Sequence, residues 1–214
     1  YICPSLFLGE NEQELISNIT KKGAKLFQCT DPVFHKISYR DRPDGLMGVA
    51  RQRVSQLNDI PFRNEKPFFL IASGIEKPGN LGTILRSADA VGVDGVIVTD
   101  HVTDLFNPNV IRASIGTLFT QPVIQATRQE ILNWAQEKGI CLIAATPHSK
   151  ETYTKVDISQ PCAILVGSEQ YGLPKEWLDL ADISVSIPMR GRADSLNVAS
   201  SATILLYEAL RQRL

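Results

Sequence analysis

Short apolar runs alternate with helical patterns from Pro67 to the end of the 214-residue chain. Such brief, almost entirely apolar runs are typical of strands buried on both faces of a parallel sheet. Strands that alternate with helices pack as a mostly parallel sheet with helices covering it. The pattern therefore predicts an α/β fold. The runs are F-F-L-I-A (68–72), G-V-I-V-T (95–99), P-V-I-Q-A (122–126), I-C-L-I-A-A-T (140–146), A-I-L-V-G (163–167) and I-S-V-S-I-P-M (183–189).

The helical stretches between these runs carry their own start and stop signals. One has an apolar stripe and ends at Gly92, a residue suited to a left-handed C-cap. Another opens with Asn107 and a proline, which favours a helix start. A third opens with Thr127 followed three residues later by Glu130, the pattern of a capping box. We therefore predict helices over 83–92, 107–116, 127–139, 175–180 and 198–214.

Residues 1–66 read as a smaller α/β segment with less regular patterning. Its spacing predicts helices over 11–20 and 31–38 and short strands over 24–29 and 46–50. Because the chain begins with Tyr1 and not with methionine, we expect its true N-terminus to be missing. The predicted division is a partial N-terminal segment over 1–57, a polar, proline-containing linker over 58–66 and a main domain over 67–214.

Composition excludes several classes of protein. An apolar content of 43% and a charged content of 21% are ordinary for a globular domain. No run of 18 apolar residues occurs, so no membrane-spanning helix is predicted. The cysteines lack a C-x-x-C pair, and neither they nor the histidines show metal-site spacing. This favours reduced thiols, a cytoplasmic protein and no metal site. These residues are Cys3, Cys29, Cys141, Cys162, His35, His101 and His148.

Charge is unevenly distributed although the net charge is only −1. Residues 1–66 hold ten basic and eight acidic residues, whereas the remainder has a net charge of −3. Arg40, Arg42 and Arg51 lie in the late part of that first segment. They predict a local basic surface able to contact phosphates. An ordinary solvated face explains the charge equally well.

The carboxyl ends of the predicted strands mark the candidate site, because ligands of parallel α/β sheets bind there. The first loop contains G-N-L-G-T-I-L-R, with Asn80 and Arg86 as functional candidates. It lacks both the G-x-G-x-x-G pattern and a P-loop lysine, which argues against a dinucleotide or nucleoside triphosphate site. Taken alone, this loop is better explained by Asn80 as a helix cap and Arg86 as a solvated charge. The four loops are 73–82, 146–150, 167–173 and 188–197.

Three stretches together resemble the motifs of a known family. They are N-L-G-T-I-L-R-S-A-D-A-V-G, I-L-V-G-S-E-Q-Y-G-L-P and I-P-M-R-G-R-A-D-S-L-N-V-A-S-S-A-T-I-L-L-Y-E-A. In order and spacing they resemble the SpoU (TrmH-like) RNA ribose 2′-O-methyltransferases of the SPOUT superfamily. The resemblance covers residues 67–214, and P-D-G-L-M-G-V-A-R at 43–51 also resembles the segment before the catalytic domain in such proteins.

The resemblance implies a fold and a cofactor. The α/β sheet would end in a C-terminal trefoil knot, an exception to the rule of unknotted chains. Residues 1–57 would be part of a ribosomal-protein-L30e-like RNA-binding domain. Family members are usually homodimers, and the apolar face of the last helix (Ile204, Leu205, Ala209) would supply part of the contact. The cofactor would be S-adenosyl-L-methionine, held at Thr146, Gly167, Ile187, Pro188, Met189 and Leu196.

The resemblance also implies catalytic positions, namely Asn80, Arg86, Glu169, Ser195 and Asn197. A ribose 2′-OH is a poor nucleophile and needs its proton removed or its charge stabilised. A guanidinium is a very weak base, so we expect Arg86 to anchor phosphate and stabilise charge, with general-base action as the alternative. Asn80, Glu169 and Ser195 are expected to orient Arg86 and the ribose.

The sequence therefore predicts methyl transfer to RNA. Ribosomal RNA is favoured over tRNA because tRNA enzymes of this family more often use terminal helices, not a preceding domain. Tyr171, in the second motif, is a further candidate for RNA contact. The alternatives are a tRNA ribose methyltransferase and a non-catalytic RNA-binding module with the same fold. A nucleotide-dependent oxidoreductase fits the alternation but lacks the glycine fingerprint.

Overall fold

The computed structural model describes residues 1–53, 55–100 and 102–214. His101, one of the three histidines, lies outside these residues. The chain divides into two compact units, Tyr1–Arg53 and Val54–Leu214. No helix in the described ranges is long and apolar enough to cross a membrane.

The first unit is small, and its regular structure is helical. It contains η1 (Pro4–Leu6), α1 (Glu12–Lys21) and α2 (Asp31–Ile37). The helices are confirmed, but the predicted strands over 24–29 and 46–50 are wrong. Each reduces to a single bridge to Ile2, at Gln28 and at Leu46. Most side chains of both stretches are exposed, so neither has a hydrophobic surface against which to extend a ladder.

The second unit is built on a six-stranded sheet in the order β3-β2-β1-β5-β4-β6. Every neighbouring pair is parallel, which confirms the predicted architecture. All six residues of β1 are buried at the centre, as expected for a strand covered on both faces. The strands are β1 (Phe68–Ser73), β2 (Gly95–Thr99), β3 (Val123–Gln125), β4 (Cys141–Ala145), β5 (Cys162–Val166) and β6 (Ile183–Val185).

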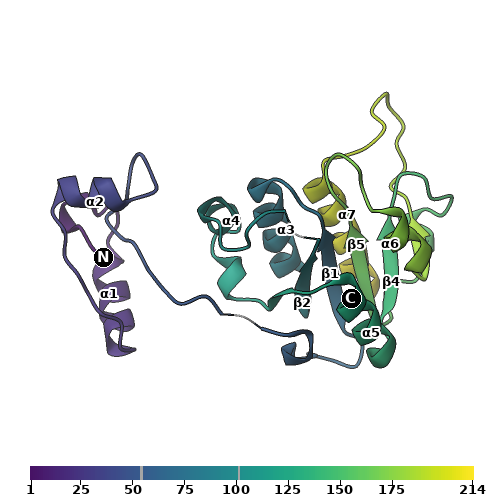
Figure 1. Ribbon diagram of the computed structural model, residues 1–214, viewed down its shortest axis with the longest axis horizontal. Helices are drawn as coiled ribbons and strands as arrows, with labels where there is room; N and C mark the ends of the chain where they lie inside the picture. Colours follow the sequence, from purple (N-terminus) through teal and green to yellow (C-terminus); the bar gives the residue numbers. More distant parts are fainter. Residues whose placement is uncertain (54, 101) are drawn as a thin grey trace. The chain divides into compact units, whose positions relative to one another are not determined.

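Helices cover both faces of this sheet (Figure 1). One face packs against α3 (Pro78–Val91), α4 (Pro108–Ala113) and α7 (Val198–Arg213). The other packs against α5 (Arg128–Lys138) and α6 (Lys175–Leu180). Successive β1 side chains serve the two cores in turn, because Leu70 lies in the first and Phe69 and Ile71 in the second.

The predicted caps form at the helix ends. The Thr127 hydroxyl accepts from the Glu130 N–H at 3.3 Å, and the Glu130 carboxylate accepts from the Thr127 N–H at 2.7 Å. Asn107 caps α4, and Gly92 ends α3 with a φ of 73°. The boundaries that differ most from the prediction belong to three elements. Helix α3 begins earlier, at Pro78, and α4 ends earlier, at Ala113. Strand β6 ends at Val185 because the chain there leaves the sheet for the third loop.

The residues just before β1 belong to the second unit and pack against its sheet. After η2 (Leu57–Asp59), Ile60 is buried, and Phe62 packs edge-on against Phe69 with centroids 5.6 Å apart. The Arg63 N–H donates to the Asp94 carboxylate at 2.8 Å. Much of the stretch expected to be a linker therefore lies against the sheet. The domain limits at 57 and 67 stay a prediction.

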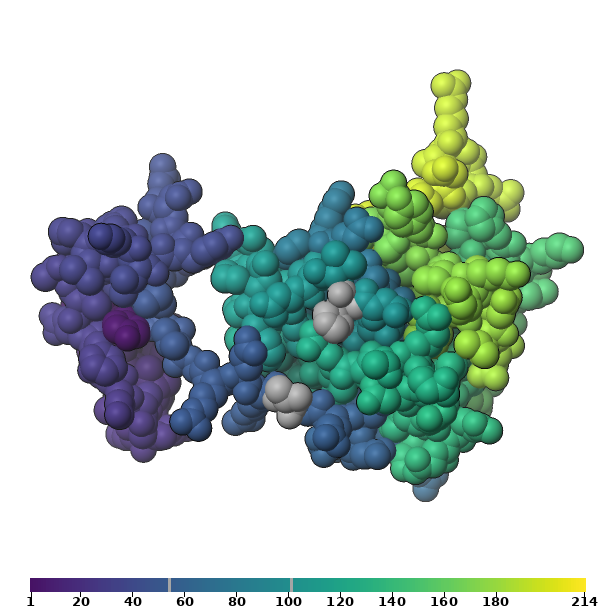
Figure 2. Space-filling view, viewed as in Figure 1, coloured from purple at the N-terminus to yellow at the C-terminus, as the bar shows by residue number. Residues whose placement is uncertain are grey.

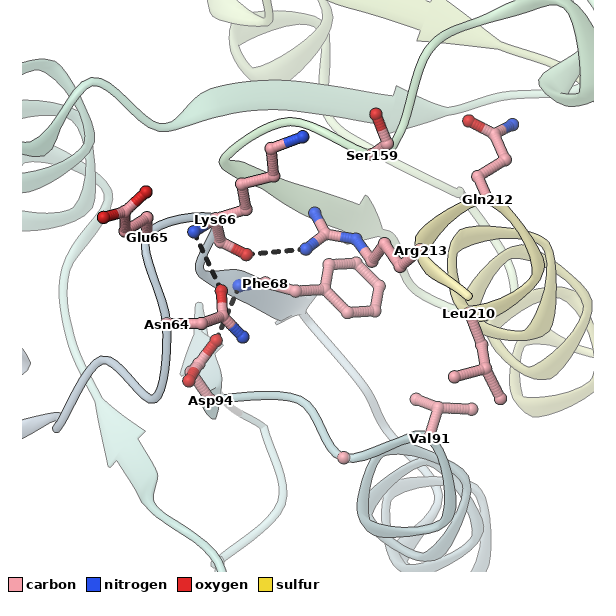
Figure 3. A pocket seen from close by; sticks show the side chains of 11 residues that line it. Asn64, Glu65, Lys66, Phe68, Val91, Asp94, Ser159, Leu210, Gln212 and Arg213 are labelled. Atoms are coloured by element: carbon pink, nitrogen blue, oxygen red, sulfur yellow. Dashed lines mark hydrogen bonds between the residues drawn. The ribbon is translucent and has the colours of Figure 1, made fainter.

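The amino ends of the strands surround a pocket of about 570 Å³ (Figure 3). Arg213, at the end of α7, donates to the carbonyl oxygens of Lys66 and Gln160 at 2.7 and 2.6 Å. Its guanidinium lies 4.6 Å from the Phe68 ring centroid. Asp94 accepts from the Phe68 N–H at 2.8 Å. These contacts fix the C-terminal helix to the start of β1, at the opposite end of the sheet from the candidate site.

Helix α7 corrects one expectation. Leu205 and Ala209, predicted to contribute to a dimer contact, are buried in the core of their own chain, against the sheet face that also holds α3. Only Ile204 of the three is partly exposed. The small and apolar positions of α7 are used for packing within the second unit, so this helix face is not free for a partner.

Candidate active site

A chain of hydrogen bonds joins the three predicted motifs at the carboxyl ends of the strands. The Asn80 amide nitrogen donates to Glu169 Oε1 at 2.6 Å. The Asn197 amide nitrogen donates to Asn80 Oδ1 at 3.2 Å. The other oxygen of the Glu169 carboxylate, Oε2, accepts from the Glu76 N–H at 3.0 Å. Oε1 also accepts from the Lys77 N–H at 3.1 Å. Residues about 90 and 117 positions apart thus form one network.

Glu169 is presented by a tight loop after β5. Ser168 and Gly172 exchange two backbone hydrogen bonds of 3.0 Å, and Gly172 has a φ of 67°. Gly167 lies directly beneath this loop. A Cβ on Gly167 would lie only 2.1 Å from the Gly172 carbonyl carbon and 2.2 Å from the Leu173 nitrogen. The close approach therefore requires glycine at position 167.

The donors around Glu169 set its protonation state. Burial alone would raise the pKa of Glu169. The N–H of Glu76, the Asn80 amide and the Lys77 N–H outweigh that effect, and the pKa of the carboxyl lies below its ordinary value. Glu169 is therefore an ionised acceptor whose oxygens both have donors. The Glu169 carboxylate joins the first and second loops through these hydrogen bonds, and it is a weak base because its pKa is lowered.

Asn197 connects the third loop to α7. Its side-chain oxygen accepts from the N–H groups of Ala199 and Ser200 at 2.9 and 3.4 Å, as an N-cap does. Its amide nitrogen remains available for Asn80. One side chain therefore starts α7 and fixes the start of that helix to α3.

Three other candidates stand apart from this network. The Ser195 hydroxyl donates to the carboxylate of its neighbour Asp194 at 3.3 Å. Arg86 is exposed on α3, and within the described ranges its guanidinium has no hydrogen bond or ion pair. Tyr171 is 78% exposed. The predicted orientation of Arg86 by Asn80 and Glu169 is therefore not seen as direct contacts.

The residues assigned to the cofactor line the ends of β4 and β6 and the loop before α7. The Thr146 N–H donates to the Val185 carbonyl at 2.9 Å, joining the two strand ends. Ile187 packs against the core, Met189 is half-buried, and Pro188 is exposed. Leu196 is 40% exposed. Residues 190–197 are exposed throughout and project from the surface in yellow tones in Figure 2.

The sequence analysis missed an anchor behind the second motif. Asp100, at the end of β2, accepts from the Ser73 hydroxyl at 2.9 Å and the Trp177 indole at 3.3 Å. It also pairs with Arg128 at 3.5 Å, and Arg128 lies over the Trp177 ring. Asp100 has a φ of 47°, unusual for a residue other than glycine. The sequence signal for Asp100 was an aspartate directly after a strand, and this position alone does not predict which side chains it contacts.

The predicted RNA-binding arginines all lie in the first unit or at its end. Arg40 forms an ion pair with Asp44, whereas Arg42 and Arg51 are exposed. No group of three or more His, Cys, Asp or Glu side chains that could hold a metal occurs in the described ranges.

The family of the chain follows from comparison with known proteins. Residues 67–207 match the SpoU rRNA Methylase family. The chain belongs to this family. The match includes the glycine beneath the second loop and all three members of the Asn80–Glu169–Asn197 network.

The similarity to individual known proteins extends beyond the residues that match the family. A 23S rRNA (uridine(2479)-2′-O)-methyltransferase from Streptomyces viridochromogenes is 37% identical over 81% of this chain. The match spans 62% of that enzyme, less than two thirds of its length. A 23S rRNA (guanosine-2′-O-)-methyltransferase from Shewanella oneidensis is 35% identical over 77% of this chain and 70% of its own length. A crystal structure of an AdoMet-bound rRNA methyltransferase from Sinorhizobium meliloti has a TM-score of 0.87 and 34% identity, covering 95% of this chain and 78% of that one.

Proposed function

We propose that this protein transfers a methyl group from S-adenosyl-L-methionine to a ribose 2′-OH of RNA. The observation that carries the proposal is the Asn80–Glu169–Asn197 network, which fixes three strand-end loops to one another within the family domain. A site held this way is pre-organised for in-line transfer, where geometry supplies much of the rate. Family membership supports the chemistry.

Ribosomal RNA is the proposed substrate. The two relatives described above are named as 23S rRNA methyltransferases. The first unit, with Arg42 and Arg51 exposed, supplies a basic surface beside the family domain in the sequence. A tRNA substrate is the second candidate, because a TrmH/SpoU tRNA modifying enzyme from A. aeolicus has a TM-score of 0.64 and 28% identity over 71% of this chain.

The chain's residues fit the proposed cofactor. Gly167 lets the second loop fold back against the end of β5, because a Cβ there would meet the backbone of Gly172 and Leu173, and this packing fixes the backbone groups that the proposal assigns to the cofactor. Ile187, Met189 and Leu196, which lie after β6 and before α7, are proposed to supply apolar contacts to the cofactor, and Thr146 lies at the end of the neighbouring β4. When bound, S-adenosyl-L-methionine supplies an electrophilic methyl group. The protein's part is to hold the RNA ribose in line with that group.

Arg86 is proposed to bind a phosphate and stabilise negative charge. A guanidinium remains protonated at neutral pH, so it is poorly suited to accept the 2′-OH proton. Its exposure on α3, with no carboxylate partner in the described ranges, leaves the positive charge free for RNA. Asn80 and Asn197 hold the surrounding loops, and Glu169 ties α3 to the second loop.

The finer assembly is also part of the proposal. We propose that the segment from β6 through α7 forms the trefoil knot of the SPOUT fold. In support, β6 pairs with β4 at the sheet edge whereas α7 returns to pack on α3 and β5. A homodimer in the cytoplasm is proposed from the family resemblance.

The deciding experiment offers methyl-labelled S-adenosyl-L-methionine with unmodified rRNA and, separately, tRNA. The expected result is label in a 2′-O-methyl nucleotide of rRNA, identified by mass mapping. Label in tRNA alone would overturn the proposed substrate. Absence of label together with absence of cofactor binding would support a non-catalytic RNA-binding module.

Arg86→Ala tests the proposed role of that residue. We expect methyl transfer to fall at least about a hundredfold, in line with removal of a charge-stabilising group. Cofactor affinity, measured by calorimetry, should stay within a few-fold of the original because Arg86 is outside the Gly167 loop. Arg86→Lys should recover part of the activity if the charge matters. Unchanged turnover in Arg86→Ala would exclude the assigned role.

A further inference from the structure

We propose that Arg112 binds a backbone phosphate of the RNA together with Arg86, in a hollow between α3 and α4. The inference rests on the proposed RNA-methylating function and adds a positioning residue that no motif named. The hollow measures about 530 Å³. Its lining residues are Pro78, Gly79, Arg86, Asn109, Arg112, Ala113 and Ile115.

The charge of this hollow is one-sided. Two arginines line it, and no acidic residue does. Within the described ranges, neither guanidinium has an ion pair or a side-chain hydrogen bond. By contrast, Arg128, Arg211 and Arg213 each have a carboxylate or carbonyl partner. Two like charges facing one space repel each other, and a bound anion would relieve that repulsion.

The ligand that fits is a phosphodiester. A guanidinium presents parallel N–H donors that match two phosphate oxygens, and two guanidiniums can share one phosphate. The hollow also receives the first residues of α3, Pro78 and Gly79.

The backbone is shaped to bring the two arginines together. Gly82 of α3 faces α4 so closely that a Cβ there would lie 2.4 Å from the Ala113 Cβ and 2.8 Å from the Val110 carbonyl oxygen. Glycine thus allows the two helices to pack in direct contact. After α4, Ile115 adopts a φ of 53°, a conformation that a β-branched residue rarely takes. Such strain persists where the surrounding structure demands it and is concentrated at functional sites.

The hollow borders the proposed active site through α3. Gly79 lines the hollow, and the next residue, Asn80, belongs to the network with Glu169 and Asn197. A phosphate held by Arg86 and Arg112 would therefore lie close to the ribose being methylated. Arg112 is a positioning residue in this scheme, since it orients the RNA and does not touch the reacting atoms.

The test compares Arg112→Gln with Lys138→Gln, which removes one positive charge from α5 on the opposite face of the sheet. RNA binding is measured with an rRNA fragment at several salt concentrations. We expect Arg112→Gln to weaken binding about tenfold and to reduce the slope of log K against log salt by about one. Lys138→Gln should match the original protein, and Arg112→Lys should keep the slope. Unchanged affinity and slope in Arg112→Gln, or equal losses in both Gln variants, would overturn the proposal.

A second measurement separates this site from the proposed activity. Once the methylated nucleotide is mapped, its flanking linkages are replaced one at a time by neutral methylphosphonates. One replacement should weaken binding by the original protein and have little further effect on Arg112→Gln. Equal losses in both proteins at every linkage would contradict the site. The original protein could bind RNA in a salt-dependent way through Arg112 and yet transfer no methyl group. That result would refute the proposed methyl transfer but would still support the phosphate site. Because Arg112 is exposed, the variant should keep its unfolding midpoint, which is the control for folding.

Discussion

At the scale of single residues, the site depends on the Asn80 side chain, which donates one hydrogen bond and accepts another. Asn80 donates from its nitrogen to Glu169 and accepts with its oxygen from Asn197. A carboxylate at this position could not donate to Glu169 and would repel it, and an aliphatic residue would remove one hydrogen bond from each partner. Asparagine is therefore required by the geometry, beyond any role as a helix cap.

Gly167 carries the sharpest residue-scale prediction. Gly167→Ala would insert a Cβ about 2 Å from the backbone of the second loop, so the loop must move. We expect a loss of about 1–3 kcal/mol in the free energy of unfolding, typical of overpacking, and at least tenfold weaker cofactor binding. Denaturant titration and calorimetry measure the two effects. The control is Gly191→Ala, whose Cβ meets nothing within 4 Å. Equal stability of the two variants would show that the close approach is not real.

The same scale shows how far sequence reasoning reaches. Asn80, Glu169 and Asn197 were found because they lie in motifs that a family shares, and the structure brings them together. Arg112 and Asp100 were missed because their meaning depends on what lies beside them across the fold. Gly82 allows α3 to pack closely on α4, so that Arg112 and Arg86 line one hollow, and no local spacing encodes that arrangement.

At the scale of elements, α7 is fixed by a polar cluster near its end. Glu208 is 8% exposed and accepts from Arg211 at 2.7 and 2.8 Å and from Gln212 at 2.7 Å. Gln212 in turn accepts from the Ile158 N–H at 2.8 Å. The cluster therefore ties the helix to the segment that precedes β5.

This cluster predicts a pH-dependent stability. The pKa of Glu208 is lowered to about 2, mainly by its hydrogen bonds from Arg211. Burial opposes this effect but is outweighed, and a hydrogen bond from Gln212 lowers the pKa further. An unfolded glutamate titrates near about 4.3. The ionised Glu208 therefore stabilises the folded state fully above the unfolded pKa, and this contribution is lost as the pH falls from about 5 toward 2. We expect Glu208→Gln to cost about 1 kcal/mol at pH 7, a modest value because Arg211 is largely in solvent.

Urea titrations of both proteins between pH 3 and 7 measure this difference. The gap in unfolding free energy between the original protein and Glu208→Gln should shrink as the pH falls. The exposed Glu137, paired with its neighbour Lys138, provides the control, and Glu137→Gln should follow the original protein throughout. A gap that stays constant with pH would disprove the contribution of the ionised Glu208.

Element boundaries were predictable where a residue itself ends the element. Gly92 and the Thr127–Glu130 box fixed helix ends correctly, because caps act within a few residues. The strands over 24–29 and 46–50 failed because their alternation had no sheet to join. Whether an apolar stretch becomes a strand depends on its neighbours in space, and those neighbours lie far along the chain.

At the scale of the whole molecule, the chain joins a family domain to a small unit of a different character. Residues 67–207 carry the family match, and Tyr1–Arg53 folds as its own compact unit with a minor core that includes Ile16 and Phe34. We infer from the proposed function that this unit contributes contacts with RNA, through the basic residues near its end.

That inference predicts different effects from two sets of charge reversals in the same unit. Replacing Arg40, Arg42 and Arg51 with Glu should weaken rRNA binding and flatten its dependence on salt, because phosphate contacts release counterions. Arg42 and Arg51 should account for most of the loss, since Arg40 is already paired with Asp44. The matched control replaces Lys21, Lys22 and Lys25, at and after the end of α1, with Glu. Both triple variants change the net charge equally, so general electrostatics would weaken both alike. A loss confined to the arginine variant, with methyl transfer to a short target oligonucleotide retained, would make the first unit a substrate-capturing module separate from catalysis. No loss in the arginine variant would leave RNA recognition to the family domain and to the hollow between α3 and α4.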